Sequence, residues 1–458
     1  MNRRSVIRTL AAIPLVLPVR ALTQGTRRAP MLKVNDFGAK GDGATLDTVA
    51  IQATIDRAAQ MGATVRFAPG VYLTGSLFLK SGVTLLIDEG VRLRGSRSLE
   101  DYASIRTRVA GIEMVWPAAL LNVYQQSGVR IEGTGVIDGD GKVFWDSYWK
   151  LRHEYEPRGL RWAADYDCRR PRLVHIYGSS DVTLRGLHLT RSGFWTVHVC
   201  YSKDVHISEV TIRNNEGGRG PSTDGIDVDS SQRVVVEKAD IECNDDAICM
   251  KAGRDSDGLR VARSTHDVTV RDCVIRDAAA GVTFGSETSG GFHHIEISGL
   301  RILGPTPIGI LFKSARTRGG QLSDIHLRDI QMQNVPTIFR INLNWNPQYS
   351  YANIPADAGN VPPYWRVLAT PVSRAEGIPR LSDVSVHDVV ARGARQAFDV
   401  AAYPEAPLRH FRFERLDWEA QSGGHIENAA DWVFRHSSVR TADGGPPVIR
   451  QSTGVTGL

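Results

Sequence analysis

Three aspartates in two short segments have the types and spacing for acid–base chemistry. Asp224 lies in the segment PSTDGIDVDSS, and Asp245 and Asp246 lie in NDDAICMKAG. The interval between them matches about one turn of a parallel β-helix, so their carboxyl groups would stack on one face. Cleaving a glycosidic bond with inversion needs a protonated acid and a water-holding base about 6.5–9.5 Å apart. Adjacent strands lie about 4.8 Å apart, and a sideways offset could provide that separation.

A repeat predicts the elements that position these aspartates. Short aliphatic and β-branched runs are joined by Gly, Asn, Asp and Ser, and strands alternate with turns rather than with long helices. This pattern is typical of a solenoid and disfavours a doubly wound sheet or a (β/α)8 barrel. We therefore predict an all-β, single-stranded right-handed parallel β-helix. The runs begin at Val83, Val129, Val182, Val205, Val234, Val268, Ile295 and Ile325.

One amphipathic helix is predicted over residues 47–61, with Gly62 as its stop signal. A solenoid has an open end whose backbone groups and apolar core need covering. A helix at the start of the first coil can cover that end. We expect the β-helix domain to span residues 32–445, followed by a C-terminal tail at 446–458.

The N-terminal segment has the pattern of an export signal. Arg3 and Arg4 precede an apolar run from Leu10 to Val19, and a small-residue cleavage site follows near Ala21. Residues 1–21 resemble a twin-arginine signal peptide, which predicts a periplasmic or secreted protein. An ordinary signal peptide or an uncleaved anchor is the alternative. The run is too short to span a bilayer as a helix.

Composition and net charge bear on which ligands and partners the protein could bind. The chain has 458 residues, 42% hydrophobic, with a formal net charge of +5, and part of this positive excess lies in the predicted signal segment. Charge therefore gives no indication of nucleic-acid binding. Five cysteines permit a disulfide but leave at least one thiol over, and we expect them to pack in the core. Their spacing forms no zinc pattern, and we predict neither a metal nor a cofactor.

Several ordered motifs resemble a known family. VNDFGAKGDG at 34–43, with the helix after it, resembles the entry module of the pectate-lyase-like β-helix superfamily. The remaining motifs resemble family 28 of the glycoside hydrolases, the polygalacturonase family, over about residues 32–440. They are GVIDGDG at 135–141 with Trp145, WTVH at 195–198, TDGID at 223–227, NDD at 244–246, GSE at 285–287 and FK at 312–313.

The resemblance assigns roles to the three aspartates. It implies that Asp245 is the general acid that protonates the glycosidic oxygen. Asp224 and Asp246 would share the attacking water as the base. Clustered carboxylates repel one another and raise at least one pKa, which keeps an acid protonated near neutral pH. Solvated turn aspartates beside strands are the alternative reading of the same positions.

Two departures from the family pattern bear on the substrate. Polygalacturonases have a Gly-His-Gly before the Gly-Ser motif and an Arg-x-Lys triplet one coil later, where this chain has Ala279 and Leu311. A leucine cannot grip a carboxylate as an arginine fork does. The sequence therefore favours a neutral sugar such as rhamnose, and with it the rhamnogalacturonan backbone as the leading pectic substrate. Exo- or endo-polygalacturonase activity on homogalacturonan is the alternative.

Further side chains are candidates for substrate binding. Lys313 could hold a carboxylate as a point charge, and an aromatic, amide-rich stretch at 339–353 could wall a saccharide cleft. The alternatives are surface loops, hydrogen-bond ladders and packed side chains. The candidates are Lys313, Lys251, Asp227, His198, Ser286, Arg316, Trp345, Tyr349 and Tyr351.

Two other classes of function stay open. A β-elimination lyase would need acidic clusters for Ca²⁺ and an arginine or lysine base, and no such base pairs with the three aspartates in the sequence. A non-catalytic carbohydrate-binding β-helix would tolerate loss of Asp245. We expect a monomer whose partner is a pectic oligo- or polysaccharide, with no nucleic acid and no membrane after signal removal. Internal or terminal attack is not determined by these residues.

Overall fold

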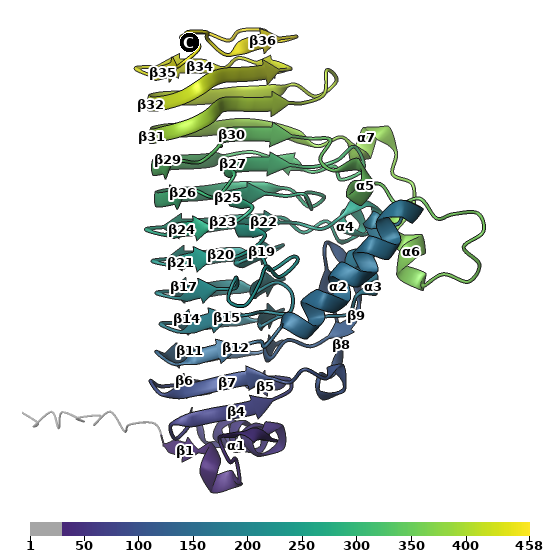
Figure 1. The fold of residues 1–458 in the computed structure, drawn as a ribbon, viewed down its shortest axis with the longest axis vertical. Coiled ribbons are helices and arrows are strands. Elements are labelled where there is room, and N and C mark those ends of the chain that lie inside the picture. The colour runs from purple at the N-terminus through teal and green to yellow at the C-terminus, as the bar shows by residue number, and fades with distance from the viewer. Residues whose placement is uncertain (1–29) are drawn as a thin grey trace, which may run out of the picture.

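The computed structural model describes residues 30–458, so the predicted signal peptide at 1–21 lies outside the described residues. The chain winds into a right-handed parallel β-helix whose coils stack along the long axis in Figure 1, as the repeat predicted. Three faces of stacked parallel strands surround one continuous apolar core. No helix among residues 30–458 is long and apolar enough to cross a bilayer.

The first face contains the repeat seen in the sequence. Ile207, Val236, Val270 and Ile297 lie on successive strands of this face in matching register, and each is fully buried. The strands of this face are β1 (Met31–Lys33), β3 (Thr64–Arg66), β6 (Thr84–Ile87), β11 (Ser127–Gly133), β14 (Ser180–Arg185), β17 (Lys203–Ser208), β20 (Gln232–Glu237), β23 (Thr265–Arg271), β26 (Phe292–Leu303), β28 (Gln321–Leu322), β29 (Ile325–Gln333), β31 (Arg380–Ala401), β32 (Leu408–Glu427), β33 (Ala429–Ala430) and β34 (Val433–Arg435).

Aspartates at one repeated turn position explain why these strands start where they do. Asp181, Asp204, Asp267 and Asp324 each adopt a positive φ of 53–55° directly before or within the start of a strand. Aspartate tolerates this left-handed conformation better than most residues. The turn directs the next aliphatic side chain into the core, which sets the register of each coil.

The second and third faces complete each coil. The second face holds β2 (Asp42–Leu46), β4 (Gly70–Thr74), β7 (Val91–Gly95), β12 (Val136–Asp138), β15 (His188–Thr190), β18 (Thr211–Arg213), β21 (Asp240–Glu242), β24 (Val274–Asp277) and β35 (Ser438–Thr441). The third face holds β5 (Leu77–Leu79), β10 (Leu121–Tyr124), β13 (Val174–Tyr177), β16 (Val197–Cys200), β19 (Ile226–Asp229), β22 (Asp246–Lys251), β25 (Ala280–Phe284), β27 (Ile308–Lys313), β30 (Thr337–Asn342) and β36 (Val448–Arg450). The long strands β26, β29, β31 and β32 pass from the first face onto the others.

Helix α1 (Thr48–Met61) covers the N-terminal end of the solenoid, at the bottom of Figure 1. Ile51, Ile55 and Ala58 on its inner side are fully buried in the core. Gly62 ends the helix with a φ of 60° in the left-handed region, a conformation that glycine adopts without strain. The predicted capping helix is therefore present, with its end at the expected glycine.

The C-terminal segment 446–458 is more ordered than the tail that we expected. Strand β36 pairs with β32, and Thr453 and Thr456 form parallel bridges to Ala430 and Val433. This segment therefore continues the last coil. It does so because the end of β32 leaves backbone groups that a further strand can satisfy.

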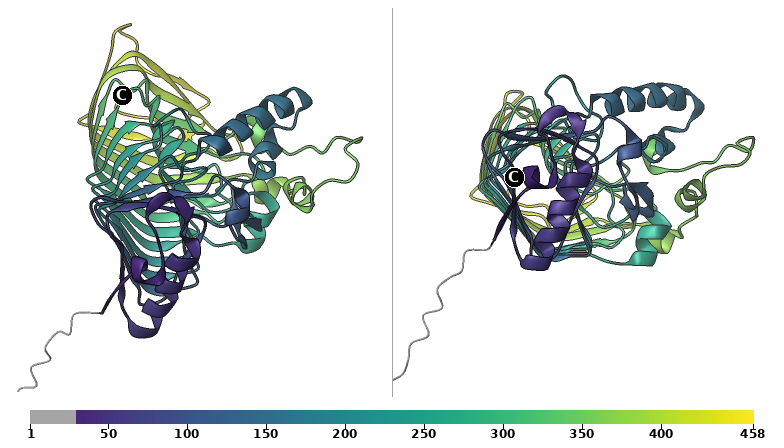
Figure 2. Two further views of the ribbon diagram at one scale, coloured as in Figure 1. Left: turned by 60° about the horizontal axis from the view of Figure 1, so that its bottom comes forward. Right: turned by 90° about the horizontal axis from the view of Figure 1, so that it is seen from below.

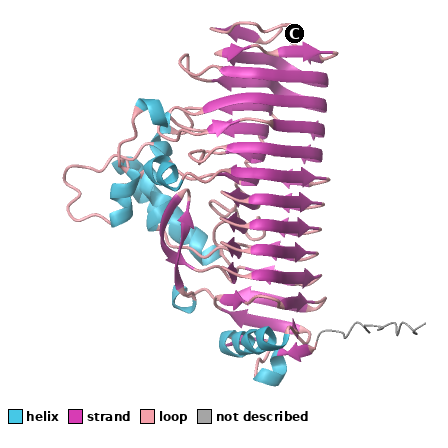
Figure 3. Ribbon diagram, turned by 180° about the vertical axis from the view of Figure 1, so that it is seen from behind, coloured by secondary structure: helices cyan, strands magenta, loops and turns pink. Residues whose placement is uncertain are grey.

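The remaining helices and a hairpin project from one side of the solenoid, as Figures 2 and 3 show from below and from behind. We call residues 104–117, 142–170, 252–264 and 343–379 the roof, because they cover the third face. The roof contains β8 (Ser104–Val109), β9 (Ile112–Pro117), α2 (Lys142–Tyr155), η3 (Glu156–Arg158), η4 (Arg161–Ala163), α3 (Ala164–Asp167), α4 (Asp255–Val261), α5 (Pro347–Ser350), α6 (Pro363–Leu368) and α7 (Arg374–Gly377). Short 3-10 helices elsewhere are η1 (Val34–Phe37) and η2 (Leu99–Asp101).

Fully buried arginines attach the roof to the coils. Arg108 of β8 lies 2.8 Å from Asp229 of β19, and Arg170 donates to the carbonyl of Pro221, shortly before β19, at 2.7 Å. Arg254 joins two roof segments to each other by donating to the carbonyl of Tyr349 at 2.8 Å. Hydrogen bonds to charged groups are stronger than neutral ones, and burial excludes competing water. The roof is therefore held at fixed points above the third face.

All five cysteines carry free, buried thiols. Cys243 and Cys273 belong to the axial core, and Cys168 packs under α2. The five cysteines form no disulfide, although the composition permitted one. Cys243 and Cys273 pack in the axial core, as we expected.

Candidate active site

The three predicted acidic residues lie together at the start of strands on the third face. Asp224 comes just before β19, and Asp246 is the first residue of β22. Ile226 of β19 pairs with Ile248 of β22, so Asp224 and Asp246 occupy equivalent positions on neighbouring coils. One carboxylate oxygen from each of Asp224, Asp245 and Asp246 lies within 4.8 Å of those of the others. The coil register expected from the sequence thus brings the three together.

Burial and mutual repulsion change how this cluster ionises. Burial raises the pKa of Asp224 well above its usual range, and the charges of Asp227 and Asp245 raise it further. Burial and the charge of Asp246 raise the pKa of Asp245 to about 6, although nearby lysines oppose this. Such close groups exchange protons as a set. In mildly acidic solution the cluster therefore holds a proton that can be donated.

Lys251 is the centre of an ion-pair network beneath the cluster. Its Nζ lies 3.4 Å from Asp224 and 3.4 Å from Asp227, and 3.5 Å from Glu287. The ammonium also lies 4.7 Å from the ring centroid of Trp195. An ammonium has three donor hydrogens, and each of the three has a carboxylate nearby inside the protein.

Glu287 completes this network from the next coil. Burial disfavours its charged form, but Lys251, Arg318 and Lys313 outweigh that effect and lower its pKa to about 2. Its Oε1 accepts a hydrogen bond from Tyr349 at 3.1 Å. Glu287 is therefore a permanent negative charge that links the catalytic face to the roof.

Lys313 supplies a second ammonium on β27. It donates to Asp246 at 2.7 Å and lies 4.3 Å from the ring centroid of Trp345. Burial opposes its charge, but Asp246 and Asp245 outweigh burial and raise the pKa of Lys313 above its usual range. Lys313 thus stays charged and fixes one oxygen of Asp246.

These residues line a hollow of about 430 Å³, counted with the open solvent at its mouth. Its floor comes from coils of the third face and its walls come from the roof. The lining residues are Ala110, Arg161, Asp165, Phe194, Trp195, Ser222, Asp224, Asp245, Asp246, Lys251, Ser286, Glu287, Lys313, Trp345 and Tyr349. Of the substrate-binding candidates, Lys251, Lys313, Ser286, Trp345 and Tyr349 are among them.

His198 and Asp227, two other candidates, lie behind the hollow. The ring of His198 packs edge-on against Trp195 with centroids 4.8 Å apart and stacks on His175 at 5.1 Å. Asp227 is fully buried and faces Lys251. Both were candidates for substrate binding, with a packed histidine and a hydrogen-bond ladder as the alternatives, but both are fully buried behind Trp195 and Lys251. They can act on the site only through those neighbours.

Arg316 and Tyr351 lie at the rim rather than in the hollow. Arg316 is exposed and pairs with Glu405 at 2.6 Å, and the hydroxyl of Tyr351 donates to Asn344 at 2.7 Å. Neither residue is part of the lining. Their loop turns away from the cluster after Ser314, so their partners are other loop residues.

The two positions that depart from the family pattern are also outside the lining. Leu311 is 3% exposed and pairs in register with Thr283, two positions before Lys313 at the end of the strand. The backbone amide of Ala279 donates to the carbonyl of Asp245 at 2.9 Å. Leu311 therefore does not provide an apolar wall of the hollow, which removes one argument for a rhamnose subsite.

Comparison with known proteins places this geometry in a family. The sequence profile described as glycosyl hydrolases family 28 matches residues 67–355, which include the cluster, both lysines and most of the hollow. The chain belongs to glycosyl hydrolases family 28. A second profile, rhamnogalacturonase A/epimerase, pectate lyase-like, matches residues 31–89. It covers the N-terminal entry module and none of the acidic cluster.

Similar proteins of this family have been described in plants and bacteria. A probable polygalacturonase of Vitis vinifera is 28% identical, and the match covers 79% of this chain and 75% of that protein. An exo-poly-alpha-D-galacturonosidase of Dickeya chrysanthemi is 26% identical over 73% of this chain and 62% of its own length. The solved exopolygalacturonase from Thermotoga maritima has the same fold, with a TM-score of 0.72 and 23% identity over 90% of this chain and 94% of that chain.

The family-28 site also contains residues that the sequence did not single out. Trp195 and Glu287 stand inside recognised motifs, so a closer reading of the motifs could have suggested them. Arg161, Asp165 and Phe194 come from segments outside the strand repeat. Phe194 lies in the turn before β16, and only the folding of the roof onto the coils brings Arg161 and Asp165 to the hollow.

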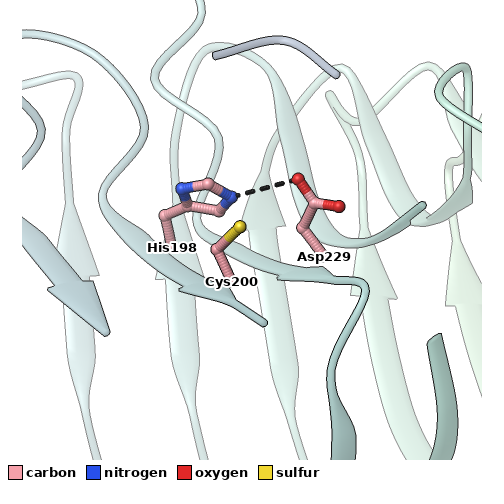
Figure 4. Close-up of side chains that lie close together, drawn as sticks. All are labelled: His198, Cys200 and Asp229. Carbon is pink, nitrogen blue, oxygen red and sulfur yellow. Dashed lines mark hydrogen bonds and ion pairs between the residues drawn. The ribbon is translucent and has the colours of Figure 1, made fainter. Parts of the chain in front are cut away.

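Two groups within residues 30–458 have side-chain atoms close enough to hold a metal ion. They are the acidic cluster and the buried group of His198, Cys200 and Asp229 shown in Figure 4. In each group a fixed cation already neutralises the carboxylate: Lys313 on Asp246 and Arg108 on Asp229. Burial, together with the charge of Arg172, also lowers the pKa of His198 to about 3. A metal ion would have to compete with these cations.

Proposed function

We propose that this glycoside hydrolase is a polygalacturonase that cleaves pectic polysaccharide with Asp245 as general acid and with Asp224 and Asp246 as the water-holding base. The observation that carries the proposal is the cluster of three carboxylates in one open hollow with two ammonium groups. Hydrogen bonds of about 2.8 Å allow one water to bridge oxygens up to roughly 5.5 Å apart. Oxygens within 4.8 Å of each other meet that limit.

The raised pKa of Asp245 supports its role as the acid. A general acid works best when its pKa lies near the working pH, and about 6 suits a mildly acidic medium. Lys313 donates to Asp246 at 2.7 Å, which places a fixed positive charge beside the proposed base. The two neighbouring aspartates thus have environments suited to opposite roles.

Galacturonan is a better substrate for this proposal than the rhamnogalacturonan backbone, which the sequence favoured. That preference rested on Ala279 and Leu311, and neither lines the hollow. Lys313 and Arg161 offer positive charge inside it, and the similar proteins include polygalacturonases. Reducing-sugar release from homogalacturonan and from rhamnogalacturonan oligomers distinguishes the two. Faster release from the rhamnogalacturonan oligomers would reverse the assignment.

Asp245→Asn tests the catalytic proposal. The amide cannot donate a catalytic proton, so we expect kcat to fall about 100- to 10,000-fold while oligogalacturonate binding by calorimetry changes less than threefold. Asp272→Asn, an exposed aspartate on the next coil, is the matched control and should keep full activity. Unchanged turnover of Asp245→Asn would leave a binding module or another acid as the explanation. Absorbance from an unsaturated product would indicate a lyase.

The stereochemistry is a separate test. The family resemblance implies inversion, yet the cluster is tighter than the separation of about 6.5–9.5 Å common in inverting enzymes. We expect inversion because Asp224 and Asp246 share one water, so neither is free to attack the sugar as a nucleophile. Proton NMR of the first product should show the anomer opposite to that of the substrate. Retained configuration would make one of these aspartates a nucleophile.

We further propose that the protein is exported and works as a monomer outside the inner membrane. The Arg3-Arg4 segment with its apolar run supports export, and substrates of this size are met outside the cell. Fractionation of cells that express the full chain, with Arg3 and Arg4 changed to lysine as the comparison, tests the route. Light scattering after chromatography tests the monomer.

A further inference from the structure

Three cationic side chains line the hollow, and they differ in how far their donors are already used. Lys251 has three carboxylates within 3.5 Å, so it has no free donor for a ligand. Lys313 donates to Asp246 and faces Trp345. Arg161 stands on the opposite wall, on η4 of the roof, and its bonding leaves part of its guanidinium unused.

Arg161 uses one arm for its attachment. Its Nη1 donates to Oδ2 of Asp165 at 2.9 Å, while no residue among 30–458 forms a hydrogen bond with its Nη2 or its Nε. The nearest carboxylate to Nε is Glu156, at 4.0 Å, beyond hydrogen-bond range. The guanidinium also lies over the ring of Tyr349, 5.2 Å from its centroid. Arg161 is therefore held in place without having its donors satisfied.

The groups around Arg161 leave one of its nitrogens for a ligand. Asp165 is shared between Arg161 and the fully buried Arg170, whose Nη2 lies 3.0 Å from Oδ1. Burial opposes ionisation of Asp165, but the two arginines outweigh it and lower its pKa to about 2. Glu156 is a second carboxylate near Arg161 and the Nε atom is buried, so Nη2 is the nitrogen that remains for a ligand.

One departure of the sequence from the family pattern concerns an arginine. The family pattern places an arginine in the Arg-x-Lys triplet, and this chain has Leu311 there, buried and outside the hollow. We infer that Arg161 provides the guanidinium that binds the carboxylate of a uronate residue in the hollow, from a roof segment rather than from the coil. The inference rests on the proposed function, because it assigns a specificity-determining residue to the same site.

A planar guanidinium suits this role better than an ammonium. It can offer two parallel N–H donors to the two oxygens of a carboxylate. A guanidinium therefore binds an acid more tightly than the corresponding ester or alcohol. An ester carries no charge and accepts such a pair poorly. The carboxylate of galacturonate should therefore be the group that Arg161 recognises, and methyl esterification should remove that recognition.

The test measures ligand binding in the Asp245→Asn background, where cleavage does not interfere. Calorimetry with trigalacturonate and with its methyl ester gives dissociation constants for the Arg161 protein and for Arg161→Gln. We expect Arg161→Gln to weaken trigalacturonate binding at least tenfold and to change ester binding less than twofold. Arg161→Lys should recover part of the loss. Arg158→Gln, an exposed arginine on the same segment, should leave both constants unchanged.

Other outcomes would overturn the inference. If Arg161→Gln weakens acid and ester equally, Arg161 only shapes the roof, and a parallel drop in Tm would show the same. If trigalacturonate binding falls less than threefold, Arg161 does not contact the carboxylate. Failure of the proposed function looks different, because the protein with both Asp245 and Arg161 intact would then neither bind nor cleave trigalacturonate.

Discussion

At the scale of single residues, the site depends on which carboxylates are neutralised and which are not. Asp246 has Lys313 at 2.7 Å, and Glu287 is ionised by its cationic neighbours. Asp245 lacks so close a partner, and burial together with the charge of Asp246 raises its pKa to about 6. Position relative to two lysines thus gives chemically identical side chains different surroundings, as the proposed acid and base roles require.

The pH dependence of turnover follows from the raised pKa of Asp245. The acid must be protonated to donate, so kcat should be high below pH 6 and fall as the pH rises through about 6. Initial rates on oligogalacturonate from pH 3 to 8 measure the profile. A plateau that extends to pH 8 would contradict the assignment of Asp245.

Lys251 should be essential for stability at neutral pH. Lys251→Met leaves Asp224, Asp227 and Glu287 buried without their shared ammonium, and breaking a buried pair costs about 3–5 kcal/mol. Burial already raises the pKa of Asp224 well above its usual range and that of Asp227 to about 7, and without the ammonium both rise further, while Glu287 loses the main cause of its lowered pKa. The variant should therefore be most stable in acid and lose stability as the pH rises toward 7.

Chemical denaturation of Lys251→Met at pH 5 and pH 7.5 measures this effect. Lys203→Met, an exposed lysine on β17, is the matched control and should change the free energy of unfolding by less than about 0.5 kcal/mol. A Lys251→Met protein as stable as the control at pH 7.5 would show that these carboxyl groups do not need the ammonium.

At the scale of elements, the roof depends on buried arginines for its position. The hairpin β8–β9 is a separate two-stranded sheet, and such a hairpin is marginally stable alone. Arg108 anchors it by donating to Asp229 at 2.8 Å and to Ser230 at 2.7 Å. Ala110, at the tip of this hairpin, lines the hollow, so the anchor also positions part of the site.

Arg108→Met should release this hairpin. The change leaves Asp229 buried without its cation, at a cost of about 3–5 kcal/mol. We expect the rate of amide hydrogen exchange to rise in residues 104–117 and KM to increase. Exchange in the coils of the first face should stay slower than in the hairpin. Arg106→Met, an exposed neighbour on the same strand, serves as the control. Equal protection of the hairpin in both variants would mean that packing of Trp116 and Ile112 holds it.

At the scale of the whole molecule, stability comes from one continuous core and not from covalent bonds. Aliphatic and aromatic side chains from successive coils form a single cluster along the axis, and helix α1 covers its N-terminal end. Each coil contacts chiefly its neighbours, as in other solenoids. The strands beneath the hollow are therefore held in place by many small packing contacts between neighbouring coils.

Reducing agent should leave stability unchanged. All five cysteines are free thiols, and each is at most 8% exposed. Thermal unfolding with and without dithiothreitol should give the same Tm within about 1 °C, since no disulfide restricts the unfolded chain. Thiol reagents should react only as the protein unfolds. A lower Tm under reduction would reveal a bridge between two of these residues.

The sequence by itself determined the fold and the acidic cluster. Strand starts, the capping helix and the spacing of Asp224 from Asp246 are local features, and in a solenoid residues one coil apart in the chain become neighbours in space. The register of β19 on β22 follows from that rule. The same rule places Lys251 and Lys313 at the ends of strands on this face, and the structure shows that their side chains reach the aspartates at the strand starts.

Only the tertiary structure decided which side chains face the hollow. The roof segments have no repeat, so no period relates Arg161 or Asp165 to the coils that they meet. Alternation along a strand likewise could not tell that Asp227 and His198 are covered, because a layer from other segments closes over them. The face that carries the three aspartates could be predicted because residues one coil apart in the chain become neighbours in space. The walls that select a substrate depend on contacts between residues far apart in the chain.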